Sequence, residues 1–275
     1  MRKGVMVFLL ALVWAGRLHA QEGLVVGITP QQSASRLAES WVPLLEEAGR
    51  RFGAALTFRT APDIKEFERR VLAGEYDVIY GSPVLYVAAA QALGARAIAR
   101  QRQDEQGILV VRGDSPVRTI EDLQGRRVAF PAASALGATV LNRASLHRGG
   151  IDVQEMTLSS DESVYRAVLD GVADAGGGAV RTLTRQGMDV RAFLRVVLIT
   201  ETFPAYPIFI LPRIGQARAA HLQAVLFSLD GDDAGKVVLA RAALLGIALA
   251  DDHTYDPIRA LSGNAVETLL KGAAP

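Results

Sequence analysis

The chain has 275 residues, half of them hydrophobic, and its 30 basic and 29 acidic residues leave a formal net charge of +1. This balance gives no electrostatic reason to bind nucleic acid or a membrane surface. The absence of cysteine excludes disulfides and an N-terminal lipid on cysteine. The length suits two domains of ordinary size or one large domain, and the core must be held together by packing alone.

The first twenty residues have the outline of a secretory signal peptide. Arg2 and Lys3 precede an apolar run over residues 4–16, and the small Ala20 stands before Gln21. A membrane anchor is the alternative, but the run falls short of the ~20 apolar residues that span a bilayer. We therefore predict removal of residues 1–20 and export to the periplasm, which leaves 27 basic and 29 acidic residues.

Strand-like and helical patterns alternate from residue 24 onward. Short apolar runs rich in β-branched or aromatic residues predict strands at residues 24–29, 55–60 and 76–81. Apolar residues at helical spacing predict helices at residues 35–51, 62–74 and 82–94. Pro43 lies inside the first of these helices and should bend it.

Two strand-like segments follow, at residues 95–100 and 107–113, and the same alternation then restarts at residue 119. We expect strands at residues 95–100, 107–113, 126–130, 153–158, 172–178 and 193–200, and helices at residues 119–125, 134–147, 161–171 and 180–187. From residue 214 the pattern is mostly helical. Alternation of this kind predicts α/β lobes with mostly parallel sheets flanked by helices. Two such runs predict two lobes with a cleft between them. We expect lobe one to comprise residues 21–110 plus 206–275, and lobe two to comprise residues 111–205.

Polar and small residues follow two of the predicted strands. Thr29, Pro30 and Gln31 come after the first strand, and Tyr80, Gly81 and Ser82 come after the third. Ligands of parallel α/β sheets lie beyond the carboxyl ends of strands, so both loops should border the cleft. Tyr80 is either a ligand contact or part of the core, and Ser82 is at least the N-cap of the following helix.

Small residues also lead into the helix predicted at residues 134–147. Ser134, Ala135, Leu136 and Gly137 leave backbone amides uncovered by side chains. Such a helix start favours an oxyanion, because its N–H groups lack partners and it carries about half a positive charge. The alternatives are a tight strand-to-helix turn that requires small residues, and Ser134 as a plain N-cap.

Several motifs together resemble the periplasmic phosphate/phosphite/phosphonate-binding proteins of ABC importers. They are a Trp-x-Pro helix at Trp41, an Ala-Pro-Asp turn at residues 61–63, and Gly-x-Tyr-Asp at residues 74–77. Further along, Asp-Leu-x-Gly-basic-x-Val spans residues 122–128 and Gly-x-x-Asp-Ala spans residues 171–175. The resemblance covers residues 23–212 and implies a two-lobed type II periplasmic binding protein that captures a small anionic solute between its lobes.

The resemblance also implies site residues, several of which depart from the family pattern. The family carries hydroxyl side chains where this chain has Ala135 and Leu136. Asp161, beside Ser160, stands where a histidine is usual, and it either caps the next helix or lines the site. Arg181 and Tyr206 replace acids that hold an amine, so we expect a ligand without one. Arg181 either pairs with the anion or lies on the lobe surface.

The expected role is that of a monomeric solute-binding protein that delivers its ligand to an inner-membrane ABC permease. We expect no enzyme activity, no cofactor, no metal and no nucleic-acid partner, because hydrolase and zinc motifs are absent from the sequence. Two alternatives remain open, a ligand sensor that docks on a sensor kinase and an enzyme on the same fold. The sequence does not choose among phosphonate, phosphate, phosphite, sulfonate and carboxylate.

Overall fold

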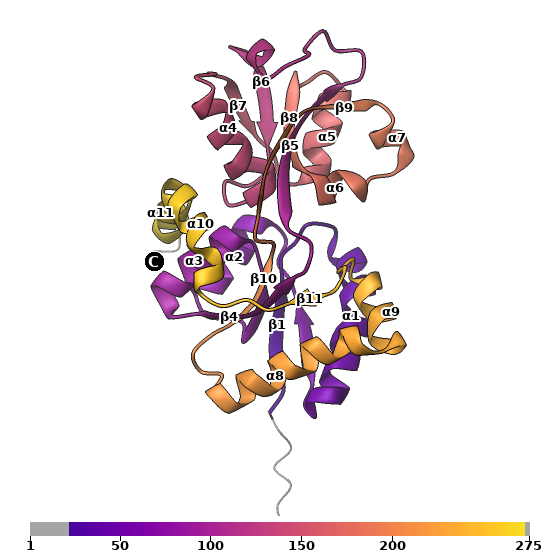
Figure 1. Ribbon diagram of the computed structural model, residues 1–275, viewed down its shortest axis with the longest axis vertical. Coiled ribbons are helices and arrows are strands. Elements are labelled where there is room, and N and C mark those ends of the chain that lie inside the picture. Colours follow the sequence, from indigo (N-terminus) through magenta and orange to yellow (C-terminus); the bar gives the residue numbers. More distant parts are fainter. Residues whose placement is uncertain (1–21, 273–275) are drawn as a thin grey trace, which may run out of the picture.

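The computed structural model describes residues 22–272, which form two lobes, each built around its own β-sheet (Figure 1). The predicted signal peptide lies outside the described residues. The sheet of lobe one has the order β11-β4-β10-β3-β1-β2, and that of lobe two has the order β7-β6-β8-β5-β9. The strands of lobe one are β1 (Leu24–Ile28), β2 (Leu56–Arg59), β3 (Val78–Tyr80), β4 (Arg96–Gln101), β10 (Pro207–Ile210) and β11 (Ile247–Ala248). Those of lobe two are β5 (Glu105–Arg112), β6 (Arg127–Phe130), β7 (Gln154–Thr157), β8 (Ala175–Ala179) and β9 (Leu194–Phe203).

Each sheet combines parallel and antiparallel pairs. In lobe one, β1 runs parallel to β2 and β3, whereas β10 is antiparallel to β3 and β4, and β11 is antiparallel to β4. In lobe two, β6 runs parallel to β7 and β8, and β5 is antiparallel to β8 and β9. Parallel pairing therefore joins the strands that alternate with helices. Each antiparallel pair of the described sheets includes one of the strands that carry the chain from one lobe to the other, β4, β5, β9 or β10.

The chain crosses between the lobes twice. Residues 102–104 connect β4 of lobe one to β5 of lobe two, and residues 204–206 connect β9 back to β10 (Figure 1). Glu105 therefore begins the strand that enters lobe two, and Tyr206 lies just before the strand that returns to lobe one. Two polar side chains are thus placed beside the connections between the lobes.

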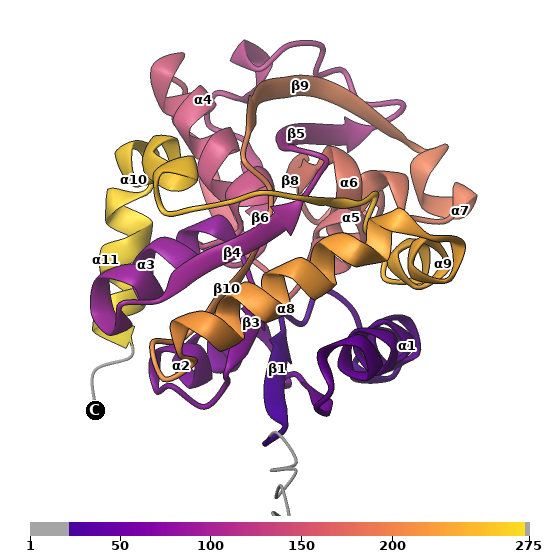
Figure 2. The same cartoon turned by 60° about the horizontal axis from the view of Figure 1, so that its bottom comes forward.

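The helices of lobe one come from both ends of the described chain. They are α1 (Ala34–Phe52), α2 (Ile64–Leu72), α3 (Pro83–Leu93), α8 (Gln216–Ser228), α9 (Asp233–Arg241), α10 (Asp256–Leu261) and α11 (Gly263–Gly272), with single 3₁₀ turns at Leu229–Gly231 and His253–Tyr255. Figure 2 shows α8 lying across the strands of lobe one. Ser33 caps α1, and Pro43 lies within that helix. Among the described residues, no helix has the length and apolar character needed to cross a membrane.

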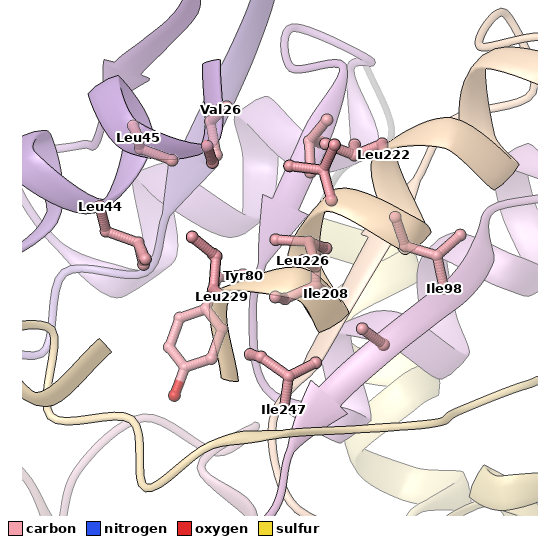
Figure 3. Close-up of a cluster of buried hydrophobic side chains, with 14 of the residues drawn as sticks. Val26, Leu44, Leu45, Tyr80, Ile98, Ile208, Leu222, Leu226, Leu229 and Ile247 are labelled. Atoms are coloured by element: carbon pink, nitrogen blue, oxygen red, sulfur yellow. The ribbon is translucent and has the colours of Figure 1, made fainter. Parts of the chain in front are cut away.

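The core of lobe one joins side chains that are far apart in the sequence. Val26 of β1 and Leu44 of α1 pack in one cluster with Ile208 of β10 and Leu226 of α8 (Figure 3). Burial of these side chains removes apolar surface from water, worth roughly 25 cal/mol per Å². This packing holds α8 and α9 on lobe one after the chain has passed through lobe two.

Two helices of lobe two differ from the sequence prediction. The helix expected at residues 119–125 is only a 3₁₀ turn, Glu121–Leu123, because the backbone becomes extended at Gln124, with a ψ of 122°, and left-handed at Gly125, with a φ of 71°. The helix expected at residues 134–147 begins as a π-helix, Leu136–Leu141, and continues as α4 (Asn142–Arg148). The remaining helices of this lobe are α5 (Asp161–Leu169), α6 (Val180–Thr184) and α7 (Met188–Arg191).

Candidate functional site

A small cavity lies between the two lobes, where the ends of strands from both sheets meet. It has a volume of about 20 Å³ and collects most of the site residues that the sequence predicted. Those that line it are Thr29, Gln31, Ser82, Ser134, Ala135, Gly137, Ser160, Asp161, Arg181 and Tyr206. We call this the central cavity.

Wider spaces adjoin the central cavity on two sides. One, of about 720 Å³, lies between helices α2 and α11 of lobe one and the lobe-two loops at residues 132–134 and 157–159. It shares Ile64, Glu68 and Ser134 with the central cavity. The other, of about 260 Å³, shares Thr29 and Gln31 with it. The central cavity is thus the narrow middle of a longer cleft.

Arg181 lies at the start of α6, directly after β8, and it contacts both lobes. Its Nε donates to Oε2 of Glu105 over 3.3 Å, and its Nη1 donates to Oε1 of Gln31 in lobe one over 3.0 Å. The guanidinium carbon lies 4.8 Å from the centre of the Tyr206 ring. Burial alone would lower the pKa of Arg181, but the adjacent carboxylate of Glu105 together with Tyr80, Tyr206 and Asp161 outweighs it, and the pKa is raised. Arg181 is therefore a buried, paired cation and does not lie on the lobe surface.

A second contact across the cleft joins Glu68 of α2 to Ser134 of lobe two. The hydroxyl of Ser134 donates to Oε1 of Glu68. Burial raises the pKa of Glu68 to about 7, against an ordinary value of 4.5, although the bond from Ser134 opposes the shift. The structure thus places a readily protonated carboxyl group at the wall of the central cavity.

Asp161 is the first residue of α5 and lines the central cavity. It does not cap the helix: Ser160 is the N-cap, and its hydroxyl accepts from the N–H of Ser163 in a capping box. Burial raises the pKa of Asp161 to about 6, while the nearby charge of Arg181 lowers it. Three carboxyl groups, those of Glu68, Glu105 and Asp161, therefore share the central cavity with Arg181.

The helix start at residues 134–138 leaves some of its amides free. The N–H of Ala135 donates to the carbonyl of Ala132 over 3.0 Å, so that amide is occupied. Within residues 22–272, the N–H groups of Leu136, Gly137 and Ala138 have no protein acceptor. Ser134 is not the N-cap, because Ala135 holds that position and Ser134 bonds to Glu68. The predicted anion-binding backbone is thus present in part.

The carboxylate of Glu105 lies against this helix start. A Cβ atom added at Gly137 would come within 2.7 Å of Oε1 of Glu105 and 2.9 Å of the Cβ of Ala179. Gly137 is therefore required by close packing. An anion that approaches these amides meets a carboxylate of the protein in the same space.

Four predicted site residues lie outside the central cavity. Tyr80 is buried, its hydroxyl donates to Oε1 of Gln101 over 2.9 Å, and its ring lies between those of Trp41 and Tyr206. Leu136 is buried in a cluster that includes Leu85 of lobe one. Pro30 and Gly81 complete this set and do not line the central cavity.

Glu68 and Glu105 line the central cavity but are not among the residues that the sequence predicted. Glu68 lies between Ile64 and Val71 on the face of α2 that turns inward. The sequence contained a signal for Glu68, because an acidic residue stands there among the apolar residues of one helix face. Glu105 begins the buried strand β5, again an acid where apolar residues are expected.

Known proteins resemble this chain in sequence pattern and in fold. Residues 26–255 match the model of a family described as periplasmic substrate-binding proteins of phosphonate ABC transporters. No curated protein sequence gives a significant match.

Solved structures show the same fold. A binding-protein component of a phosphonate ABC transporter from Pseudomonas aeruginosa has a TM-score of 0.79 at 15% identity, covering 92% of this chain and 96% of its own. A Prochlorococcus marinus protein in complex with methylphosphonate has a TM-score of 0.79 at 15% identity, covering 88% and 98%. A Xanthomonas citri protein with bound chloride has a TM-score of 0.76 at 19% identity, covering 90% and 98%.

Proposed function

Because this chain belongs to the family of periplasmic substrate-binding proteins of phosphonate ABC transporters, we propose that it binds a small oxyacid at the central cavity and delivers it to a membrane permease. The cavity of about 20 Å³ has room for about one water molecule, so it must widen to admit the ligand. The observation that carries the proposal is the position of Arg181. It lies on lobe two, in a cavity between the lobes, and bonds to Gln31 of lobe one. A ligand held there contacts both lobes at once, so that its binding favours closure.

The donors around the cavity suit an oxyacid. The N–H groups of Leu136, Gly137 and Ala138 are free of protein acceptors within residues 22–272. The guanidinium of Arg181 offers a planar set of donors that matches phosphonate or carboxylate oxygens. The methylphosphonate bound to the Prochlorococcus marinus protein supports a ligand of this kind.

The acidic side chains narrow the ligand class further. Glu68, Glu105 and Asp161 would repel a fully ionised anion but accept hydrogen bonds from one that still carries a proton. Phosphonates, phosphate and phosphite carry a P–OH group near neutral pH, whereas sulfonates do not. The proposed ligand is therefore a protonated phosphorus oxyacid, and Asp161 is an acceptor for it.

Transport requires export and a membrane partner. We propose that residues 1–20 are removed on export, that the mature chain acts as a monomer in the periplasm, and that its partner is an ABC permease of the inner membrane. The family match supports the periplasmic location and the transport role. Release of the ligand needs only opening of the lobes and no covalent step.

Calorimetric titration of the mature chain tests the ligand class. We expect methylphosphonate, phosphate or phosphite to bind and methanesulfonate not to bind at pH 7. A bound oxyacid at a hundred times its dissociation constant should stabilise the fold by about 2.7 kcal/mol.

Asp161→Asn should admit methanesulfonate, since an amide also donates hydrogen bonds. Arg118 is exposed and lines none of the three cavities, so Arg118→Gln is the control. Equal binding of methanesulfonate by the unaltered chain would contradict the role of the carboxylates.

A further inference from the structure

The cavity of about 260 Å³ beside the central cavity differs from it in charge. It lies against the first two turns of α1, the end of β3 and the segment after α9, and it receives Arg185 from lobe two. Two arginines line it, Arg185 and Arg241, and none of its lining residues is acidic. The central cavity, by contrast, holds three carboxyl groups and one arginine. We call the cavity of about 260 Å³ the side cavity.

Arg185 has no acidic partner. Its Nη2 donates to the carbonyl of Ala243 in lobe one over 2.7 Å, and no carboxylate of residues 22–272 lies within 4.0 Å of its guanidinium or that of Arg241. Arg181, one turn away, is neutralised by Glu105, but Arg185 is not. Arg185 is half-buried and Arg241 is exposed, and neither charge is balanced by a carboxylate, so both guanidinium groups are available to an anion.

The local electrostatics favour a negative group in the side cavity. Burial, and then repulsion by Arg181, lower the pKa of Arg185. An anion beside it would oppose both effects. The N-terminal end of α1, a helix of 19 residues, adds partial positive charge on the same side of the cavity.

The end of helix α9 forms part of the wall of the side cavity. The N–H of Ala243 donates to the carbonyl of Ala240 and the N–H of Leu244 to that of Leu239, an ordinary helix C-terminus in which Ala243 takes the left-handed conformation with a φ of 54°. The carbonyl of Ala243 is the acceptor for Arg185. The end of α9 thus holds the guanidinium of Arg185 at the wall of the side cavity.

We propose that the side cavity is a second anion site, in which Arg185 of lobe two and Arg241 of lobe one bind one oxyanion group, a phosphate, phosphonate or carboxylate. Guanidinium groups bind such oxygens in pairs. The anion is either a free ion or the far acidic group of a ligand whose other end occupies the central cavity, since the two cavities share Thr29 and Gln31. Because its two arginines belong to different lobes, occupancy favours the closed form; that coupling rests on the proposed function, whereas the binding of the anion does not.

The test is a phosphate titration at constant ionic strength, followed by calorimetry, with the unaltered mature chain, Arg185→Gln, Arg241→Gln and the control Arg118→Gln. We expect each of the two side-cavity variants to weaken phosphate binding about tenfold, the effect of one lost charge-assisted contact, and the control to bind as the unaltered chain does. Arg241 lines the side cavity and not the central one, so its effect is specific to the second site. Phosphate binding that is unchanged in both variants, or absent in the unaltered chain, would overturn the proposal.

Two further measurements separate the sources of the anion and the two proposals. Two phosphates per chain would indicate a free ion, whereas tighter 1:1 binding of methylenediphosphonate would indicate the far group of one ligand. Selenate soaked into crystals should give an anomalous peak between Arg185 and Arg241, and a peak only at Arg181 would overturn the second site. If the central cavity is not the ligand site, Arg181→Gln leaves phosphate binding unaffected while Arg241→Gln still weakens it.

Discussion

At the scale of single residues, the central cavity is governed by charges that compensate one another. The guanidinium of Arg181 and the carboxylate of Glu105 are both almost fully buried, with 7% and 3% of their side chains exposed. Such a pair is costly to break, because the remaining partner stays in a poorly solvated environment without a counter-charge. The stability of the fold and the proposed recognition of the ligand therefore depend on the same two side chains.

Arg181→Gln should lower the free energy of unfolding by about 3–5 kcal/mol, because it leaves Glu105 buried and unpaired. The double variant Arg181→Gln with Glu105→Gln should recover much of that loss, since no isolated charge remains. Urea unfolding of both, with Arg118→Gln as the surface control, measures the difference. Equal destabilisation of the single and the double variant would show that the pair contributes through packing and not through charge.

Residue types at strand ends could be predicted from the sequence, but their partners could not. The loops after β1 and β3 and the helix start at residues 134–137 were identified, and ten of the predicted residues line the central cavity. The pairing of Arg181 with Glu105 could not be predicted, because the two residues are 76 positions apart and meet only when β5 and β8 pair in the sheet. The roles given to these residues in ligand binding stay predictions.

At the scale of elements, the helix start at the cavity depends on the glycines of β8 and on Asn142. A Cβ atom at Gly177 would come within 2.1 Å of the carbonyl of Ala138, so only glycine lets this helix approach the strand so closely. Asn142 is fully buried, and its amide nitrogen lies 2.9 Å from the carbonyl of Ile108 and 3.0 Å from that of Gly137. The side chain thus ties the π-helix to β5 and fixes the direction of the free amides.

Asn142→Leu should destabilise the fold by about 2 kcal/mol or more, because it leaves buried carbonyl groups without donors. Hydrogen exchange should also become faster at residues 137–141, where the wider helical turn loses its tether. Asn264→Leu, at an exposed position of α11, is the matched control. Unchanged exchange at residues 137–141 would mean that the π-helix is maintained by packing alone.

The predicted elements failed where a long-range contact decided the local form. Alternating patterns placed the strands and most helices, because amphipathic periodicity is a local property of the sequence. The π-helix requires Asn142 to reach a carbonyl on β5, 34 residues earlier, and no local pattern contains that information. The helix at residues 119–125 is shortened for a local reason instead, because Gln124 is extended and Gly125 has a positive φ.

At the scale of the whole molecule, three polar contacts between residues of the described range 22–272 hold the lobes together. Ser134 bonds to Glu68, Arg181 to Gln31, and Arg185 to the carbonyl of Ala243, each from lobe two to lobe one. The apolar side chain of Leu136 adds to them by packing in a cluster of lobe one. The structure is therefore that of a closed form, and its opening exposes Glu68 to water.

The closed form should be favoured at low pH. The pKa of Glu68 is about 7 in this form, above its ordinary value of 4.5, so the closed form binds a proton more tightly than an open one. The stabilisation of the closed form by protonated Glu68 is complete below pH 4.5 and is lost as the pH rises through 7. This change in the free energy of closure is on the order of 1–3 kcal/mol.

Small-angle X-ray scattering can measure this dependence. The radius of gyration of the ligand-free chain should be larger at pH 8 than at pH 5. Glu68→Gln should remove most of the change and leave the part due to Asp161, whose pKa is about 6. The exposed Glu162 serves as the control, and Glu162→Gln should behave as the unaltered chain. A radius that does not depend on pH would show that Glu68 does not govern closure.

The last helix, α11, forms one wall of the cavity of about 720 Å³ at the entrance to the cleft, opposite the lobe-two loops. A bulky side chain introduced at a lining position of α11, such as Thr268, would therefore narrow this cavity. The same position offers an advantage for engineering. A fluorophore at Thr268 of α11, with a quencher at Ser159 on the facing loop, would turn the chain into an optical reporter of its own ligand.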